Sequence, residues 1–176
     1  MVIEFTSYGY KENGIYHNYP EDYNQKNHVV GIYGDHRGYA ISVIQLINEP
    51  NQLIRIVVDE IDSSIMSFDK TLRDLKKLAT KYQIRTVQVN EEYELEKIIS
   101  SRIDYYPFDI NTKELKINTG LIEIAGLSND GYLKIHSQNL IEEIKKFDPE
   151  IGSHRVFALM IGLREIDTAF NWMLLT

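Results

Sequence analysis

An apolar run, a turn punctuated by glycines and a second apolar run follow one another over residues 28–47, HVVGIYGDHRGYAISVIQLI. Runs of β-branched and aromatic residues bounded by glycine are typical of strands. The stretch therefore predicts two strands joined by a short turn. The first strand is apolar on both faces over residues 29–32, which predicts a central strand covered by helices on each side. Tyr33 and, one glycine later, Asp35 stand at the end of this strand.

The composition limits the possible classes of protein. The chain has 176 residues, 43% of them hydrophobic, which suits one domain with its own core. The net charge of −7 argues against a surface that holds DNA by charge neutralisation alone, although a local basic patch stays possible. The absence of cysteine excludes disulfide and thiolate chemistry. We find neither a signal-peptide pattern nor an apolar run of ~18 residues, so we expect a cytoplasmic protein without membrane contact.

Two regions are expected from the pattern along the chain. Residues 1–27 are rich in tyrosine and polar residues, which predicts an arm of short extended pieces or a linker to a neighbouring domain. Residues 28–176 form the predicted domain. After the first two strands, a third at 53–61 completes an antiparallel meander. Apolar residues then recur every three or four positions from Ser67, which indicates an amphipathic helix with Ser67 as N-cap.

The second half of the domain alternates strands and helices. A short strand at 84–89 follows the first helix, and a crossover of that length makes it parallel to the first strand. The remaining predicted elements are a helix at 92–101, a strand at 105–110, a helix at 113–127, an extended piece at 133–136, a helix at 140–147 and a last helix at 153–173. Three antiparallel strands, then parallel strands with flanking helices, give the α/β order of an RNase H-like mixed sheet.

Four stretches in this order resemble the nuclease domain of viral large terminases, which package and cut phage DNA. The stretches are VVGIYGDHRGYAISVIQL, IRTVQVNEEYELEKI, LSNDGYLKIHSQNLIEEIKKF and GSHRVFALMIGLRE. The resemblance implies three or more acidic residues at the C-terminal edge of the sheet, where two divalent metals ~3.5–4 Å apart activate water and stabilise the leaving oxygen. The matching positions here are Tyr33, Asn90 and His154, none of which is a carboxylate.

The loss of these acids predicts that the metal site is gone, because magnesium prefers charged oxygen ligands. The chain is then similar to the vestigial nuclease domain of phi29-type packaging ATPases, which implies a non-catalytic role in a packaging motor. An active Mg- or Mn-dependent endonuclease is the alternative, and it needs substitute ligands. Asp35 and Glu91 are the first candidates for these ligands, and Asp59 and His154 are secondary candidates. We expect Asp35 to serve as a turn residue and Glu91 to begin a helix.

The partners implied are viral DNA or RNA, other motor subunits or the portal. The best candidate for nucleic-acid binding is the basic side of the first helix with the strand after it: Lys70, Arg73, Lys76, Lys77, Lys81 and Arg85. Such a face is more often only solvated, and acidic residues are interleaved with it. The sequence has no phosphate-binding loop and no dinucleotide pattern, so we expect no ATPase activity and no cofactor. A cellular interaction module on the same scaffold is a third possibility.

Overall fold

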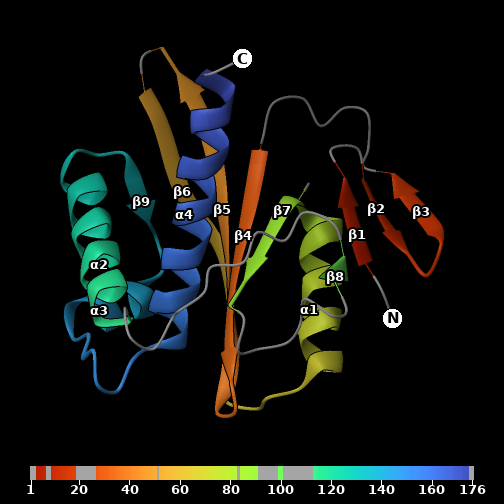
Figure 1. Cartoon of the computed structure of the whole chain (residues 1–176), viewed down its shortest axis with the longest axis horizontal. Coiled ribbons are helices and arrows are strands. Elements are labelled where there is room, and N and C mark those ends of the chain that lie inside the picture. The colour runs from red at the N-terminus through yellow and green to blue at the C-terminus, as the bar shows by residue number, and fades with distance from the viewer. Residues whose placement is uncertain are drawn as a thin grey trace.

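The computed structural model describes residues 3–6, 9–18, 27–50, 52–82, 84–90, 99–100 and 113–174. Its main sheet has five strands in the order β7-β4-β5-β6-β9 (Figure 1). The bounds are β4 Asn27–Asp35, β5 Gly38–Glu49, β6 Gln52–Ser63, β7 Ile84–Val89 and β9 Leu133–Ile135. The antiparallel meander β4-β5-β6 and the parallel pairing of β7 with β4 are both confirmed. β4 lies inside the sheet, although β5 is the middle strand.

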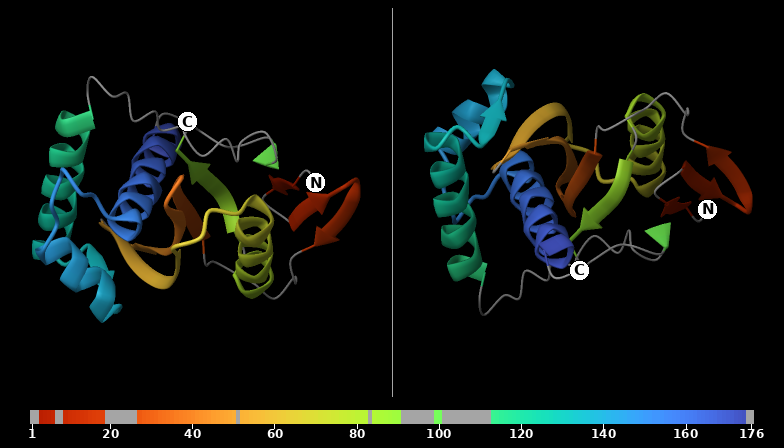
Figure 2. Two further views of the ribbon diagram at one scale, coloured as in Figure 1. Left: turned by 90° about the horizontal axis from the view of Figure 1, so that it is seen from below. Right: turned by 90° about the horizontal axis from the view of Figure 1, so that it is seen from above.

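Alternation of side chains along the strands divides the interior into two cores. Val30, Ile32 and Tyr39 face helix α1 (Phe68–Lys81), together with Leu72 and Leu75 of that helix. The other face carries a second core against helix α4 (His154–Leu174), and its members include Val29, Tyr33, Ala40, Ile44, Phe157 and Ile161. Figure 2 shows α1 and α4 on opposite sides of the sheet. The prediction that helices cover both faces of the first strand is therefore confirmed.

The helices begin and end close to their predicted bounds. The side chain of Ser67 accepts a hydrogen bond from the backbone N–H of Lys70, which confirms Ser67 as the N-cap of α1. α2 spans Lys113–Asn129 and α3 spans Gln138–Lys145. Both lie beyond β9 on the α4 side of the molecule (Figures 1 and 2). None of the helices in the described residues combines the length and hydrophobicity that a membrane span requires.

The backbone of α4 packs directly against β4 at Gly31. A Cβ atom at this position would be 2.1 Å from the carbonyl oxygen of Ala158 and 2.5 Å from the backbone nitrogen of Gly162. Glycine at 31 therefore allows the helix backbone to pack directly on β4. This contact fixes the start of α4 relative to the ends of the strands.

The tyrosine-rich N-terminal segment contains three strands, β1 (Ile3–Thr6), β2 (Gly9–Glu12) and β3 (Ile15–Asn18). They form a second sheet, in which β8 (Ile99–Ser100) pairs with β1 in parallel. The helix predicted at 92–101 is therefore wrong at its end, because residues 99–100 pair with a strand far upstream that a local pattern does not reveal. Residues 91–98 and the strand predicted at 105–110 lie outside the described residues.

Candidate functional site

The C-terminal ends of β4, β6 and β7 meet at one edge of the main sheet, since the three strands run in the same direction. α4 begins at this edge. The residues matched to the terminase acids come together there: Tyr33 near the end of β4, Asn90 directly after β7 and His154 in the first turn of α4. Asp35 is close to them, because it lies within hydrogen-bond distance of His154. Tyr33, Asp35, Asn90 and His154 therefore lie at one place, where their contacts hold the strands and α4 together.

Asn90 connects β7 to β4 through its side chain. Its Nδ2 donates to the carbonyl oxygen of Gly34 at 2.8 Å, and its Oδ1 accepts from the backbone N–H of Gly34 at 2.9 Å. The backbone N–H of Asn90 donates to Ile32 at 3.3 Å. The Asn90 side chain therefore continues the hydrogen bonding between β7 and β4 past the end of β7, at a buried position. A carboxylate could not replace it fully, because an ionised carboxylate accepts hydrogen bonds but donates none.

Tyr33 belongs to the core at this edge. Its ring packs against the ring of Phe157, with centroids 4.7 Å apart, and against the ring of His154 at 5.6 Å. The side chain is only 3% exposed. The aromatic ring of Tyr33 therefore packs β4 against the first turns of α4. The resemblance implies the first metal ligand at this same position, residue 33.

Asp35 is the only carboxylate among the four residues, and it binds two basic side chains. Its Oδ2 accepts from Nη2 and Nε of Arg37 at 2.8 and 3.0 Å, and its Oδ1 accepts from the backbone N–H of Arg37 at 2.8 Å. Nε2 of His154 lies 2.8 Å from the same Oδ1. Burial works to raise the pKa of Asp35, but the hydrogen bonds from Arg37 and His154 outweigh it and lower that pKa to about 2.

Arg37 also connects the turn between β4 and β5 to the segment before α4. Its Nη1 donates to the carbonyl oxygen of Ile151 at 3.2 Å. Asp35 acts as a turn residue, as expected, because its carboxylate accepts a hydrogen bond from the backbone N–H of Arg37. The contact with His154 adds a tertiary link that the sequence did not indicate.

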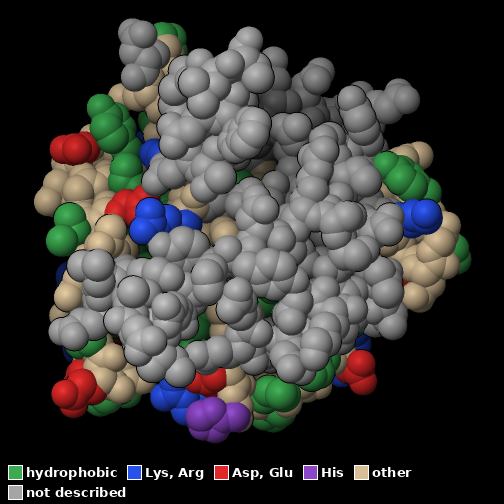
Figure 3. Space-filling model, viewed as in Figure 1, with side chains coloured by type: hydrophobic (Ala, Val, Ile, Leu, Met, Phe, Trp, Pro, Cys, Tyr) green, Lys and Arg blue, Asp and Glu red, His purple; other side chains and the backbone are tan. Residues whose placement is uncertain are grey.

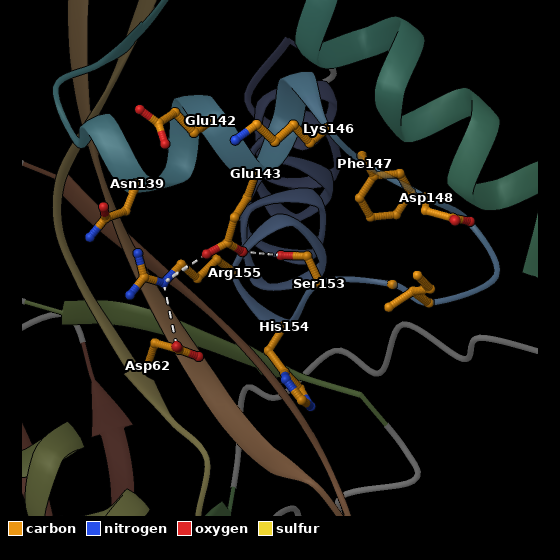
Figure 4. Close-up of a pocket in the computed structure, with 12 residues that line it drawn as sticks. Asp62, Asn139, Glu142, Glu143, Lys146, Phe147, Asp148, Ser153, His154 and Arg155 are labelled. Atoms are coloured by element: carbon orange, nitrogen blue, oxygen red, sulfur yellow. Dashed lines mark hydrogen bonds and ion pairs between the residues drawn. The ribbon is translucent and has the colours of Figure 1, made fainter.

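A second charged group at this edge was not predicted from the sequence. Arg155 follows His154 on α4 and lies 3.2 Å from Glu60, 3.6 Å from Asp62 and 3.5 Å from Glu143. Figure 4 shows the contacts with Asp62 and Glu143. Part of this group could have been inferred from the sequence, because Glu60 and Asp62 stand at alternate positions near the end of β6 and alternate residues of a strand share one face.

The matched positions and Asp35, as the structure describes them, do not fit the two-metal centre that the resemblance implies. Divalent cations such as Mg²⁺ require several oxygen ligands, preferably carboxylates. Asp35 is committed to Arg37 and His154, and Asn90 uses both of its polar atoms on Gly34. Within the ranges that the structure describes, no group of three or more His, Asp or Glu residues is arranged to hold a metal.

The remaining acidic candidates lie elsewhere. Asp59 is on the α1 side of the sheet, where its Oδ2 accepts from Nζ of Lys81 at 2.7 Å and from the hydroxyl of Tyr82 at 3.0 Å. It is therefore not part of the edge group, because it occupies the opposite face from Glu60. Glu91 lies outside the described residues, as does the start of the helix expected there.

The basic side of α1 has many internal partners. Lys70 donates to the hydroxyl of Tyr39 at 3.0 Å and lies 3.5 Å from Asp74, and Lys77 is 3.7 Å from the same carboxyl group. The hydroxyl of the buried Tyr39 donates to Asp74 at 2.6 Å.

Two further lysines on α1 contact acids from other elements. Lys76 reaches Glu12 of β2 at 2.6 Å, and Lys81 reaches Asp59. Arg73 is exposed, and its Nε donates to the carbonyl oxygen of Asp69 at 3.4 Å. Figure 3 shows the face of the molecule seen in Figure 1, on which basic and acidic side chains are interspersed in the coloured parts.

No family model matches the sequence, and none of the curated proteins does. Among solved structures, the chain is similar to the large terminase nuclease from thermophilic phage G20c. The two chains are 15% identical, the match covers 90% of this chain and 92% of that chain, and the TM-score is 0.52. At this identity the likeness shows the fold. The predicted RNase H-like fold, in the form found in a terminase nuclease, is thus confirmed.

Proposed function

We propose that this chain is a non-catalytic nuclease-like domain of a viral DNA-packaging motor, with a role in contacting nucleic acid, other motor subunits or the portal in the host-cell cytoplasm. The fold supports the nuclease-like part of the proposal. The observation that carries the non-catalytic part is the engagement of Asp35, the only carboxylate among the four edge residues, by Arg37 and His154.

Two further features support the proposal. The amide of Asn90 is used to join two strands, and the ring of Tyr33 is packed in the core. Both residues occupy positions where the resemblance implies metal ligands. Each has a structural role that a carboxylate could not take over without loss, because a carboxylate offers neither the N–H donor of Asn90 nor the apolar surface of Tyr33.

The test is incubation of the purified protein with supercoiled plasmid and Mg²⁺ or Mn²⁺, alongside a metal-dependent endonuclease as positive control. We expect no cutting above the level of a buffer blank. Asp35→Ala and Glu91→Ala are the informative variants, and Asp69→Ala, at an exposed acid of α1, is the matched control. Metal-dependent cutting that disappears in the first two variants but persists in Asp69→Ala would overturn the proposal in favour of an active endonuclease.

A further inference from the structure

α3 and the segments on either side of it lie beside the C-terminal edge of the main sheet, because Ser137 contacts Glu60 near the end of β6 and Ile151 contacts Arg37 in the turn after β4. We call residues 137–153 the α3 strap. Together with the first turn of α4 and the end of β6, the strap encloses a cleft of about 490 Å³ (Figure 4). The cleft lies beside His154, which lines it. The position of the strap therefore determines how open the sheet edge is.

Apolar contacts attach one side of the strap. Leu140 is fully buried in the core between the sheet and α4. The ring of Phe147, two residues after the end of α3, meets the ring of Phe157 edge to face, with centroids 5.6 Å apart. These two contacts hold the strap to α4. They leave the side of α3 that carries Glu143 to be positioned by polar groups.

Two polar contacts of the strap involve Arg155 or its ion-pair partner Glu60. Oε1 of Glu143 lies 3.5 Å from Nε of Arg155, and its Oε2 accepts from the hydroxyl of Ser153 at 2.5 Å. At the other end of the strap, the hydroxyl of Ser137 donates to Oε1 of Glu60 at 2.5 Å. The same Glu60 oxygen accepts from Nη1 of Arg155 at 3.2 Å. Glu143 thus ties the strap to Arg155, while Ser137 contacts Glu60 of β6 directly and Ile151 accepts a hydrogen bond from Arg37 in the turn between β4 and β5.

The charges make this arrangement dependent on Arg155. Glu60 and Asp62 of β6 face Glu143 of the strap, and the guanidinium lies between them. Like charges brought together without a cation repel each other, and the repulsion is stronger where water is partly excluded. The side chains of Arg155 and Glu60 are only 18% and 17% exposed. Loss of Arg155 would therefore leave three carboxylates in opposition across the cleft.

We propose that Arg155 is an ionic clamp that holds the α3 strap closed over the C-terminal edge of the sheet, and that release of this clamp opens the cleft while Leu140 and Phe147 keep the strap attached. The clamp concerns the position of a segment and does not depend on whether the domain cuts DNA. It goes beyond the proposed function, because it gives the sheet edge two states that differ in access.

The absence of cysteine from the chain allows a direct distance measurement. Spin labels at His36→Cys, in the turn between β4 and β5, and Asn139→Cys, on the strap, report the distance between the edge and the strap by double electron–electron resonance. A reference pair at His36→Cys and Asp69→Cys reports the position of α1 relative to the same turn. All of these sites are exposed.

We expect Arg155→Gln to shift the 36–139 distance distribution to longer values and to broaden it, with the 36–69 distribution unchanged. Arg73→Gln, which removes an exposed arginine from α1, is the matched control and is expected to change neither pair. In 1 M NaCl, where the screening length falls to about 3 Å, the clamp weakens in the wild type and the repulsion weakens in Arg155→Gln. The two 36–139 distributions should therefore converge.

A 36–139 distribution in Arg155→Gln that coincides with that of Arg73→Gln would overturn the proposal, since the apolar contacts and the hydrogen bonds of Ser137 and Ile151 would then position the strap without Arg155. Equal shifts in both label pairs would also overturn it, because they indicate general loosening of the domain. If Arg155→Gln does not fold, Glu143→Ala removes the strap's own contact with the clamp. That variant must lengthen the 36–139 distance, and an unchanged distance refutes the clamp.

Discussion

The side chain of Asn90 and the backbone of Gly34 form a closed pair of hydrogen bonds, in which the amide donates to the carbonyl oxygen at 2.8 Å and accepts from the N–H at 2.9 Å. The pair is buried and joins the end of β7 to the end of β4. Because the amide acts as donor and acceptor at once, this position discriminates between asparagine and the acid that the terminase resemblance implies.

Asn90→Asp is therefore expected to destabilise the domain. A carboxylate at 90 would place negative charge against the carbonyl oxygen of Gly34 and leave that oxygen without its donor. The cost of a broken buried hydrogen bond with an unsatisfied group is about 1–3 kcal/mol. Urea unfolding at neutral pH measures it, with the exposed Asn139→Asp as control. Equal stability of the two variants would show that the Gly34 contact contributes nothing.

The low pKa of Asp35 predicts a pH-dependent contribution to stability. The folded-state pKa of about 2 lies below the unfolded value of 3.8, so the unfolded state binds the proton more tightly. The stabilisation is present above pH 3.8 and is lost as the pH falls through about 2. It amounts to about 2 kcal/mol when fully present. Asp35→Asn should lower the free energy of unfolding at pH 6 and do so progressively less as the pH falls to 3, whereas the exposed control Asp69→Asn should not. A constant difference across this range would contradict the assignment.

Two glycine substitutions should act in opposite directions. Gly31→Ala places a Cβ against backbone atoms of α4, which cannot move as a flexible side chain does. Forced displacement in a packed core costs about 1–3 kcal/mol.

Gly126→Ala in α2 meets no atom within 4 Å and is expected to stabilise the domain by about 0.5–1 kcal/mol, since alanine is the better helix former. Thermal unfolding of both variants checks the prediction, and a Gly31→Ala protein as stable as the wild type would refute the close contact of α4 with β4.

Nucleic-acid binding by α1 is a further proposal, and its best contacts are Arg73 and Lys77. Both are exposed, and Lys77 lies 3.7 Å from Asp74, whereas Lys76 and Lys81 form closer ion pairs, at 2.6 and 2.7 Å, with Glu12 and Asp59. Replacing Arg73 and Lys77 by Gln should weaken binding to a 20-base-pair duplex and reduce the salt dependence of the binding constant by a slope of about 2. Fluorescence anisotropy between 50 and 200 mM salt measures this, with the exposed Lys134→Gln as control. Unchanged binding would remove α1 as the contact surface.

The sequence predicted most of the fold because its local patterns agree with the tertiary structure. The apolar runs in β4 and β5 and the three-to-four spacing in α1 each reflect burial that the final structure provides. Ser67 could be identified as an N-cap because capping depends on the side chain of one residue and the N–H groups that follow it. β8 could not be identified, since its pairing with β1 depends on a partner distant in the chain.

The sequence by itself determined which chemical groups reach the sheet edge. It placed a tyrosine, an amide and an imidazole at the three matched positions, with Asp35 two residues after Tyr33. Only the tertiary structure decided what these groups do, because hydrogen bonds and ion pairs depend on distances across elements. It brought His154 to Asp35, closed Asn90 on Gly34 and set Arg155 among carboxylates from β6 and α3, none of which follows from spacing along the chain.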